Sequence, residues 1–347
     1  MNLLLTPAQQ QQQAARSHAV QAQLDALTKP PGALGLLEAL AMKLAVVLGG
    51  AAPQPPLVLV FAGDHGLVAE GVSCYPAEVT PQMVANILAG GAAVSVLAAQ
   101  HALPLYVVDA GVAVPLAPHP RLLANKVAAG TANARHAAAM STTQAQAALD
   151  AGAAALATAV AAQDRNTVIF GEMGIGNSAI AALLVHAFTG IVLDDCIGRG
   201  TGVDDAGLAH KRRVLAGVVA RHGVVADPLA RLAAYGGFEL AAMAGAMIAA
   251  AQQGRLILVD GYIASAALAV AVAFQPATLD ACVFCHCSAE PGHRKLLAHW
   301  QATPLLDWQM RLGEGSGAVL AWPLLAAAHA MRTQMATFAS AQVSTPA

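Results

Sequence analysis

Charged residues are scarce in this sequence, and neither sign of charge dominates. Of 347 residues, 18 are Lys or Arg and 20 are Asp or Glu, which leaves a formal net charge of -2. The chain therefore lacks the basic surface and the dense Lys/Arg tract with which nucleic-acid-binding proteins attract phosphate backbones. We expect small-molecule partners and no nucleic-acid partner.

Cysteines are also few, and they form no spaced disulfide framework. Three of the 5 are clustered at Cys282, Cys285 and Cys287. The N-terminus has no basic start, no long apolar stretch and no small-residue cleavage site, so a secretory signal is not expected. Both features favour a reducing compartment, and we expect a cytoplasmic protein.

The cysteine cluster, with His286 and His293 nearby, raises the question of a zinc site, because thiolate and imidazole are good zinc ligands. Its spacing does not match a paired-knuckle site, and residues 282–285 form an apolar, strand-like run. Free cysteine in such a run behaves as a small hydrophobic residue. We predict no metal site.

Apolar residues are abundant, at 57% of the chain with a mean hydropathy of +0.56. Residues 240–251 are too few for a membrane span of roughly 20 residues, and residues 256–274 carry Asp260-Gly261 near their start. Covered parallel strands followed by helices explain such runs better. No membrane partner is expected.

Four short apolar runs are each followed by glycine or an acidic residue. They are residues 57–62, 105–108, 167–170 and 256–259, and each precedes an Ala-rich stretch with helical composition. Strands that alternate with helices predict an α/β fold, here a Rossmann-like parallel sheet with helices on both faces. Ligands bind outside the carboxyl ends of such strands, so the polar residues there, including Asp64, Asp109 and Asp260, are expected at one edge.

The two ends of the chain are predicted to form a smaller helical domain. Residues 8–26 favour a helix that residues 28–32 end, and residues 305–335 favour helix broken at Gly313 to Gly317 and at Pro323. The predicted boundaries are 1–30 and 300–347 for the small domain and 31–299 for the large nucleotide-binding domain.

A glycine-rich turn at residues 171–177 follows the third predicted strand, and a helix is expected to begin near Asn177 or Ser178. Glycines allow close backbone approach, and N–H groups at a helix start favour an anion such as phosphate. The spacing matches neither the lysine-bearing phosphate loop nor the dinucleotide fingerprint, so a plain tight turn stays an equal alternative. A second glycine cluster at 198–202 precedes a helix with Lys211, which is positioned to reach a phosphate or to lie on a solvated face.

Glu314 lies between two glycines in Leu312-Gly313-Glu314-Gly315-Ser316-Gly317. Partial burial in such a loop would raise its pKa toward the working pH of a general base. A carboxylate that caps a helix is the equal alternative. Asp64-His65 is expected to have a structural or pocket-shaping role, since such residues at a strand end often satisfy backbone groups.

Seven motifs in order give the sequence a resemblance to a known family. They are Lys29-Pro30-Pro31-Gly32, Gly63-Asp64-His65-Gly66, Glu70-Gly71-Val72, residues 171–177, Gly236-Gly237-Phe238-Glu239, Ser288-Ala289-Glu290 and residues 311–317. Together they resemble the nicotinate-nucleotide:dimethylbenzimidazole phosphoribosyltransferases, which act in assembly of the cobalamin nucleotide loop.

The resemblance implies a transfer of phosphoribose from nicotinate mononucleotide to 5,6-dimethylbenzimidazole, with Glu314 as the general base and no cofactor. It places phosphate and ribose at Glu172, Gly174, Ile175, Gly176, Asn177, Ser178, Gly202, Lys211, Ser288 and Gly292. It places the base at Tyr75, Pro76, Met83 and Leu312. Because family members vary at Tyr75 and Met83, adenine, benzimidazole and phenolic bases stay open as acceptors. The resemblance also implies a homodimer with sites near the subunit contact.

Two other functions remain alternatives at the level of sequence. A non-catalytic protein that binds a nucleotide or ribazole would keep the phosphate loop, although the presence of Glu314 speaks against it. A dinucleotide-dependent reductase would need the Gly-x-Gly-x-x-Gly fingerprint followed by an acidic residue, which the sequence lacks.

Overall fold

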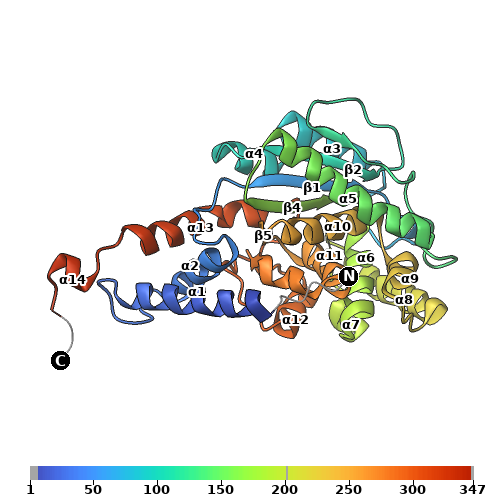
Figure 1. Ribbon diagram of the computed structural model, residues 1–347. Coiled ribbons are helices and arrows are strands. Elements are labelled where there is room, and N and C mark those ends of the chain that lie inside the picture. Colours follow the sequence, from blue (N-terminus) through green and yellow to red (C-terminus); the bar gives the residue numbers. More distant parts are fainter. Residues whose placement is uncertain (1–6, 201, 345–347) are drawn as a thin grey trace.

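The computed structural model describes residues 7–200 and 202–344, and its centre is a parallel sheet of six strands (Figure 1). The strands are β1 Leu57–Gly63, β2 Leu105–Gly111, β3 Leu122–Ala124, β4 Thr167–Met173, β5 Leu256–Val259 and β6 Cys282–Phe284. Their order in the sheet is β3-β2-β1-β4-β5-β6. From β1 the chain adds strands outward to one edge, and from β4 it adds them outward to the other, so the strand order reverses between β1 and β4. This is the Rossmann-like α/β fold predicted from the sequence, and such a reversal is where open parallel sheets bind ligands.

The helices connect successive strands or extend from the chain ends. They are α1 Pro7–Asp25, α2 Leu36–Val47, η1 Gly66–Glu70, α3 Val79–Ala89, α4 Ala93–Gln100, α5 Thr142–Ala162, α6 Asn177–Thr189, α7 Leu193–Cys196, α8 Asp205–His222, α9 Pro228–Tyr235, α10 Phe238–Gln252, α11 Tyr262–Phe274, η2 Pro276–Ala281, α12 Pro291–His299, α13 Ser316–Gln334 and α14 Phe338–Ala341.

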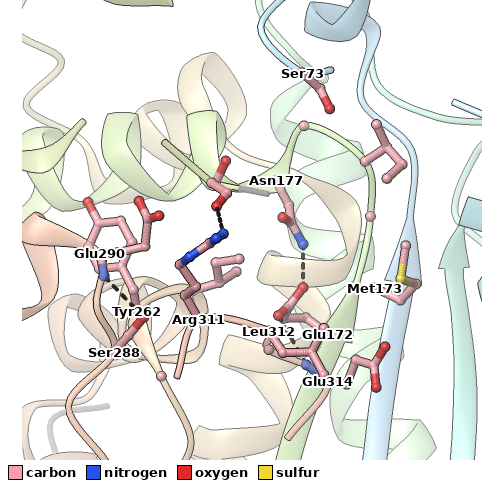
Figure 2. Close-up of a pocket in the computed structure, with 18 of the residues that line it drawn as sticks. Ser73, Glu172, Met173, Asn177, Tyr262, Ser288, Glu290, Arg311, Leu312 and Glu314 are labelled. Atoms are coloured by element: carbon pink, nitrogen blue, oxygen red, sulfur yellow. Dashed lines mark hydrogen bonds between the residues drawn. The ribbon is translucent and has the colours of Figure 1, made fainter. Parts of the chain in front are cut away.

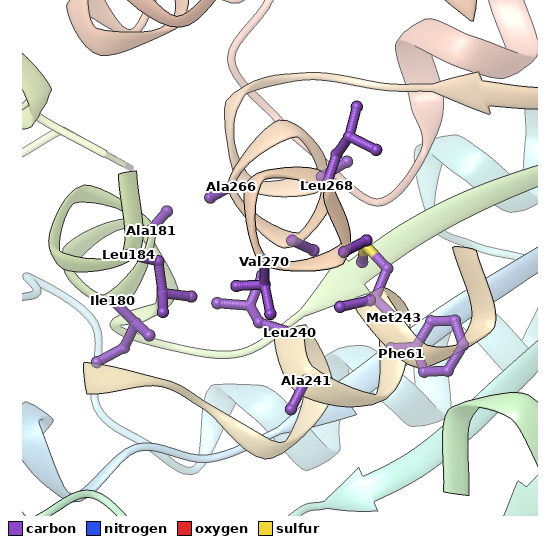
Figure 3. Packing of buried hydrophobic residues seen from close by; sticks show 14 of the residues in the cluster. Phe61, Ile180, Ala181, Leu184, Leu240, Ala241, Met243, Ala266, Leu268 and Val270 are labelled. Atoms are coloured by element: carbon purple, nitrogen blue, oxygen red, sulfur yellow. The ribbon is translucent and has the colours of Figure 1, made fainter. Parts of the chain in front are cut away.

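Side chains of the strands alternate between two hydrophobic clusters, one on each face of the sheet. Leu57, Leu59 and Phe61 of β1 pack with α5, α6, α10 and α11, as Figure 3 shows for part of this cluster. Val58 and Val60 pack on the opposite face with α1 to α4 and α13. Because neighbouring strand residues point to opposite faces and both faces are covered, the strands read as continuous apolar runs.

Helices α5 and α10 pack closely because each places a glycine against the backbone of the other. A Cβ atom added to Gly152 would lie 1.7 Å from the carbonyl oxygen of Ala242, and one added to Gly245 would lie 1.9 Å from that of Leu149. The Ala-rich composition of both helices thus has a packing role, since small side chains allow the two backbones to approach.

The two chain ends pair with each other, as the sequence led us to expect. Leu27 forms an antiparallel bridge with Thr337, and the side chain of Arg332 donates a hydrogen bond of 2.8 Å to Oε1 of Gln23. Figure 1 shows α1, α2 and the far end of α13 together at one end of the molecule. Their apolar residues belong to the same cluster as one face of the sheet. The boundaries at residues 30 and 300 stay a prediction.

Two expectations for the C-terminal region are wrong. Residues 305–310 form no helix but run along the end of β6, where the N–H of Leu306 donates to the carbonyl oxygen of Cys285 and that of Cys287 to Leu306. Pro323 does not break α13, which continues through it. Pro323 is exposed, while Val319, Trp322 and Leu325 are buried, and their burial outweighs the proline's cost of about 3 kcal/mol.

By length and composition, two stretches of the described chain, Val79–Gln100 and Thr142–Ala162, are apolar enough to cross a membrane. The first is divided into α3 and α4 near Gly90 and Gly91, and the second is α5, which packs closely on α10. Core helices pass the same criteria. That no membrane is a partner stays a prediction.

Candidate active site

A cavity of about 600 Å³ opens at the carboxyl edge of the sheet, next to the reversal between β1 and β4 (Figure 2). Residues that follow four different strands contribute to it. Its lining is formed by Val72, Ser73, Tyr75, Val79, Met83, Glu172, Met173, Gly174, Ile175, Gly176, Asn177, Ser178, Arg199, Gly200, Val203, Asp260, Gly261, Tyr262, Ile263, Ala264, His286, Ser288, Glu290, Arg311, Leu312, Gly313 and Glu314.

The glycine-rich turn after β4 leads directly into α6, which begins at Asn177. Gly176 has a φ of 89°, and a Cβ on Gly174 would lie 2.4 Å from the carbonyl oxygen of Gly63. The first position needs the left-handed region and the second has no room for a side chain, so glycine is required at both. The first turn of α6 therefore faces the cavity, with the partial positive charge that helix starts carry.

Lys211 supports this turn from α8 and is 1% exposed. Its Nζ donates hydrogen bonds to Oγ of Ser178 (2.9 Å) and to the carbonyl oxygen of Gly198 (3.3 Å). Burial lowers the pKa of Lys211 to about 8, while the nearby Glu290 acts in the opposite direction. The ammonium group is therefore immediately behind Ser178, which lines the cavity.

Glu314 has a left-handed backbone, with φ 64°, between Gly313 at 89° and Gly315 at 91°. Its carboxylate is largely buried, and Oε2 accepts a hydrogen bond of 3.4 Å from the backbone N–H of Val94. Burial raises the pKa of Glu314, the charge of Asp260 adds to the increase, and the Val94 N–H opposes it. A carboxylate with a raised pKa that faces a cavity is suited to accept a proton.

Glu172, the second carboxylate of the cavity, lies between Asn177 and Glu314 (Figure 2). Its Oε2 accepts a hydrogen bond from the side-chain amide of Asn177, and Oε1 accepts one of 3.3 Å from the backbone N–H of Glu314. Burial holds the pKa of Glu172 well above its ordinary value, with further increases from the charges of Asp260 and Glu239. Glu172 thus connects the glycine-rich turn after β4, the candidate phosphate turn, to the loop of Glu314.

Part of the cavity lining is apolar. Tyr75, Met83 and Leu312 belong to it, together with Val72, Val79 and Met173, and we refer to these residues as the apolar wall. Tyr75 is 48% exposed and Leu312 is 57% exposed. Thioether and aromatic side chains suit a flat ring.

The structure brings together most, but not all, of the residues predicted for the site. Pro76, Gly202, Lys211 and Gly292 are outside the lining. Lys211 reaches it through Ser178, as described above. Gly292 is packed beneath Tyr262, where an added Cβ would lie 2.7 Å from the phenolic oxygen, and Gly202 is exposed. Asp64 and His65 also lie outside the lining, where Asp64 accepts a hydrogen bond from Ala113 N–H and His65 pairs with Glu239.

Sequence reasoning assigned no role to several polar residues that line the cavity. They are Asp260, Tyr262, His286, Glu290, Arg199 and Arg311. Glu290 and Arg311 lie inside two of the seven motifs, and Asp260 directly follows a predicted strand. Their positions could therefore have indicated that they line the site. The three clustered cysteines are buried, and their thiols lie near backbone carbonyl groups. Within residues 7–200 and 202–344, no group of three or more His, Cys, Asp or Glu side chains is placed to hold a metal ion.

A reversal point in a parallel sheet, a helix start backed by a buried lysine, and a buried carboxylate with a raised pKa are features typical of an α/β enzyme. Residues 9–343 match the family model described as phosphoribosyltransferase. The chain belongs to the family of nicotinate-nucleotide–dimethylbenzimidazole phosphoribosyltransferases.

Relatives match along nearly the whole chain. Enzymes named nicotinate-nucleotide–dimethylbenzimidazole phosphoribosyltransferase are 56% identical in Cupriavidus taiwanensis, over 94% of both chains, and 49% identical in Pseudomonas aeruginosa, over 92% of both. The crystal structure of CobT from Thermus thermophilus superposes with a TM-score of 0.92 at 42% identity, over 96% of this chain and 100% of that one.

Proposed function

We propose that this chain transfers the phosphoribosyl group of nicotinate mononucleotide to 5,6-dimethylbenzimidazole, and so forms α-ribazole 5′-phosphate and nicotinate for the cobalamin nucleotide loop. The observation that carries this proposal is the position of Glu314. Its carboxylate lines the same cavity as the phosphate turn and the apolar wall, and its pKa is raised.

Each substrate group has a matching part of the cavity. The 5′-phosphate binds at the first turn of α6, where Lys211 adds positive charge behind Ser178. The benzimidazole ring stacks against the apolar wall of Tyr75, Met83 and Leu312. This arrangement directs the ring nitrogens toward the ribose between the two sites.

The reaction then needs one proton acceptor. One benzimidazole nitrogen attacks the anomeric carbon as Glu314 accepts the proton from the other nitrogen. The bond from that carbon to the pyridinium nitrogen breaks, and its electron pair neutralises the pyridinium as nicotinate leaves. Attack from the face opposite the leaving group converts the β-nucleotide to the α-riboside.

A catalytic role is supported over a non-catalytic binding protein, because the relatives are named as transferases and the cavity holds a buried, proton-accepting carboxylate. Cytoplasmic location and preference for 5,6-dimethylbenzimidazole over other bases are further parts of the proposal. We also propose a homodimer, which the exposed apolar side chains of Trp308 and Leu312 support.

The experiment mixes metal-stripped protein with nicotinate mononucleotide and 5,6-dimethylbenzimidazole and follows nicotinate and the riboside phosphate by chromatography. Both products are expected in equal amounts. Binding of the mononucleotide without either product would instead favour a binding protein.

Glu314→Gln tests the assignment of the base. The amide keeps the shape but cannot accept the proton, and we expect kcat to fall by about 10²–10⁴-fold with substrate binding retained. Asp150→Asn, on the exposed side of α5, is the matched carboxylate-to-amide control and should keep wild-type turnover. Near-normal turnover of Glu314→Gln would refute the assignment.

A further inference from the structure

Asp260 links the end of β5 to the helix that follows Glu314. The side chain is 3% exposed, its Oδ1 accepts a hydrogen bond of 2.9 Å from the N–H of Ala318, and its Oδ2 accepts one of 3.3 Å from the N–H of Gly315. Both donors belong to the start of α13, whose first amides have no partner within the helix. The carboxylate thus holds the residue directly after Glu314 and the first turn of α13 at once.

His286, which follows β6, reinforces this contact from the other side. Its Nε2 lies 3.6 Å from Oδ1 of Asp260, and both side chains are 3% exposed. A Cβ on Gly317 would lie 2.0 Å from Cδ2 of His286, so the imidazole ring packs directly against the first turn of α13. Asp260 and His286 together therefore fix where α13 begins.

The loop that they hold has a demanding backbone. Gly313, Glu314 and Gly315 all have φ values in the left-handed region, and Glu314 carries a side chain there. A non-glycine residue keeps such a conformation only where its surroundings determine it. The contacts that do so are the hydrogen bond from Glu314 N–H to Glu172 on one side and those to Asp260 on the other.

Asp260 also acts on Glu314 through its charge. Its carboxylate interacts electrostatically with four titratable groups: His286, Glu172, Glu314 and the thiol of Cys285. Burial raises the pKa of Asp260, while His286 and the amides at the start of α13 oppose that increase. The negative charge of Asp260 in turn adds to the increase in the pKa of Glu314 that burial causes.

We propose that Asp260, supported by His286, is a positioning residue that holds Glu314 where it accepts the proton of the attacking base. This inference rests on the proposed function. It assigns to Asp260 no contact with the reacting atoms, only the orientation of the group that makes that contact.

Asp260→Asn is the test, with Asp109→Asn as the matched control. Asp109 lies in the C-terminal half of β2, accepts a backbone N–H from Val112 and is buried, but it lies outside the cavity lining. For Asp260→Asn we expect kcat to fall by about 10-fold to 10²-fold, since a small misplacement of a catalytic group has effects of this size. KM for nicotinate mononucleotide should change by less than about threefold, because the phosphate turn is untouched.

The pH profile separates positioning from a general loss of structure. Glu314 works when deprotonated, so the rate falls as pH drops through its pKa. Removal of the negative charge at Asp260 lowers that pKa, and the acidic limb of kcat should move to lower pH in Asp260→Asn but not in Asp109→Asn. The proposal would be overturned if Asp260→Asn kept the wild-type kcat per folded molecule and the acidic limb of its pH profile did not move.

Two further variants complete the test. If Asp260 acts through Glu314, Asp260→Asn should cost much less in a Glu314→Gln background than in the wild type, and full additivity would contradict the proposal. If Asp260→Asn fails to fold, His286→Gln replaces it as the test variant. This substitution keeps a hydrogen-bond donor, disturbs the fold less than Asp260→Asn, and is also expected to lower kcat. If the wild-type protein itself forms no product, the proposed function fails, whereas an active wild type with an unaffected Asp260→Asn variant sinks this inference alone.

Discussion

Lys211 and Glu314 are both moved toward neutrality by burial, although they carry opposite charges. Burial disfavours whichever form is charged, so it lowers the pKa of the lysine to about 8 and raises that of the glutamate. The lysine remains a cation below pH 8, while the glutamate becomes a better proton acceptor. One physical effect thus acts on both the proposed phosphate site and the proposed base.

The pKa of Lys211 predicts a pH dependence for nucleotide binding. Lys211 loses its proton as pH rises through about 8, while a phosphate monoester with a second pKa near 6 stays a dianion. KM for nicotinate mononucleotide should therefore rise above pH 8, as measured by initial rates at saturating base.

Lys211→Met should raise KM for nicotinate mononucleotide about tenfold or more at pH 7, since a hydrogen bond to a charged group contributes about 1.5–3 kcal/mol. The variant should also lose most of the increase in KM above pH 8. Arg212→Met, on the exposed side of the same helix, should behave as the wild type. A Lys211→Met variant with an unchanged pH profile would show that another group titrates.

At the scale of elements, the loop from Gly313 to Gly315 and the end of β4 at Gly171 and Glu172 depend on each other. A Cβ on Gly313 would lie 2.0 Å from Oε1 of Glu172, and one on Gly171 would lie 2.0 Å from the carbonyl oxygen of Glu314. The end of β4 and the start of α13 are therefore in direct backbone contact. The glycines of both motifs therefore allow this close backbone contact, in addition to leaving room for a ligand.

The contact of α5 with α10 leads to a stability prediction. Gly152→Ala would drive a methyl group into the carbonyl of Ala242, and we expect the free energy of unfolding to fall by about 1–3 kcal/mol, as is usual for an overpacked core. Denaturant unfolding measures the change. Ala154→Ser, on the exposed side of α5, should change it by less than about 0.5 kcal/mol, and equal stabilities of the two variants would contradict the prediction.

At the scale of the whole molecule, α1, α2 and α13 contribute to the hydrophobic cluster on one face of the sheet, and residues 311–314 line the cavity. Trp308 and Leu312 in the loop between α12 and α13 are 64% and 57% exposed, and Leu312 also lines the cavity. A subunit contact at this loop would cover both side chains and would place the partner close to the site.

Light scattering after size exclusion should therefore give twice the 35.0 kDa mass of the chain. Trp308→Glu should shift the equilibrium toward the monomer and make the melting temperature depend more strongly on concentration, because dissociation is coupled to unfolding. Val224→Glu, at an exposed apolar position just after α8, is the control. A monomeric wild type would refute the homodimer.

Much of the fold was predictable because local patterns reported it directly. The runs at residues 57–62, 105–108, 167–170 and 256–259 became β1, β2, β4 and β5, and α6 begins at Asn177 as expected. β3 was missed because its three residues, Leu122–Ala124, are too short an apolar run to indicate a strand. The helix predicted from residue 305 was wrong because those residues pair with the end of β6, a contact between distant segments that no local pattern reports.

The sequence by itself determined the α/β class and the position of the glycine-rich turn, because strand runs and glycine spacing are local properties. It also singled out Glu314 as the candidate base, through ordered motifs that resemble those of a known family. Only the tertiary structure decided that Lys211 stands behind Ser178, that Gly292 and Pro76 lie outside the cavity lining, and that Asp260 holds the loop of Glu314. These relations join residues from different strands and helices. Their physical cause is burial and hydrogen bonding at one edge of the sheet, which exist only once the chain has folded.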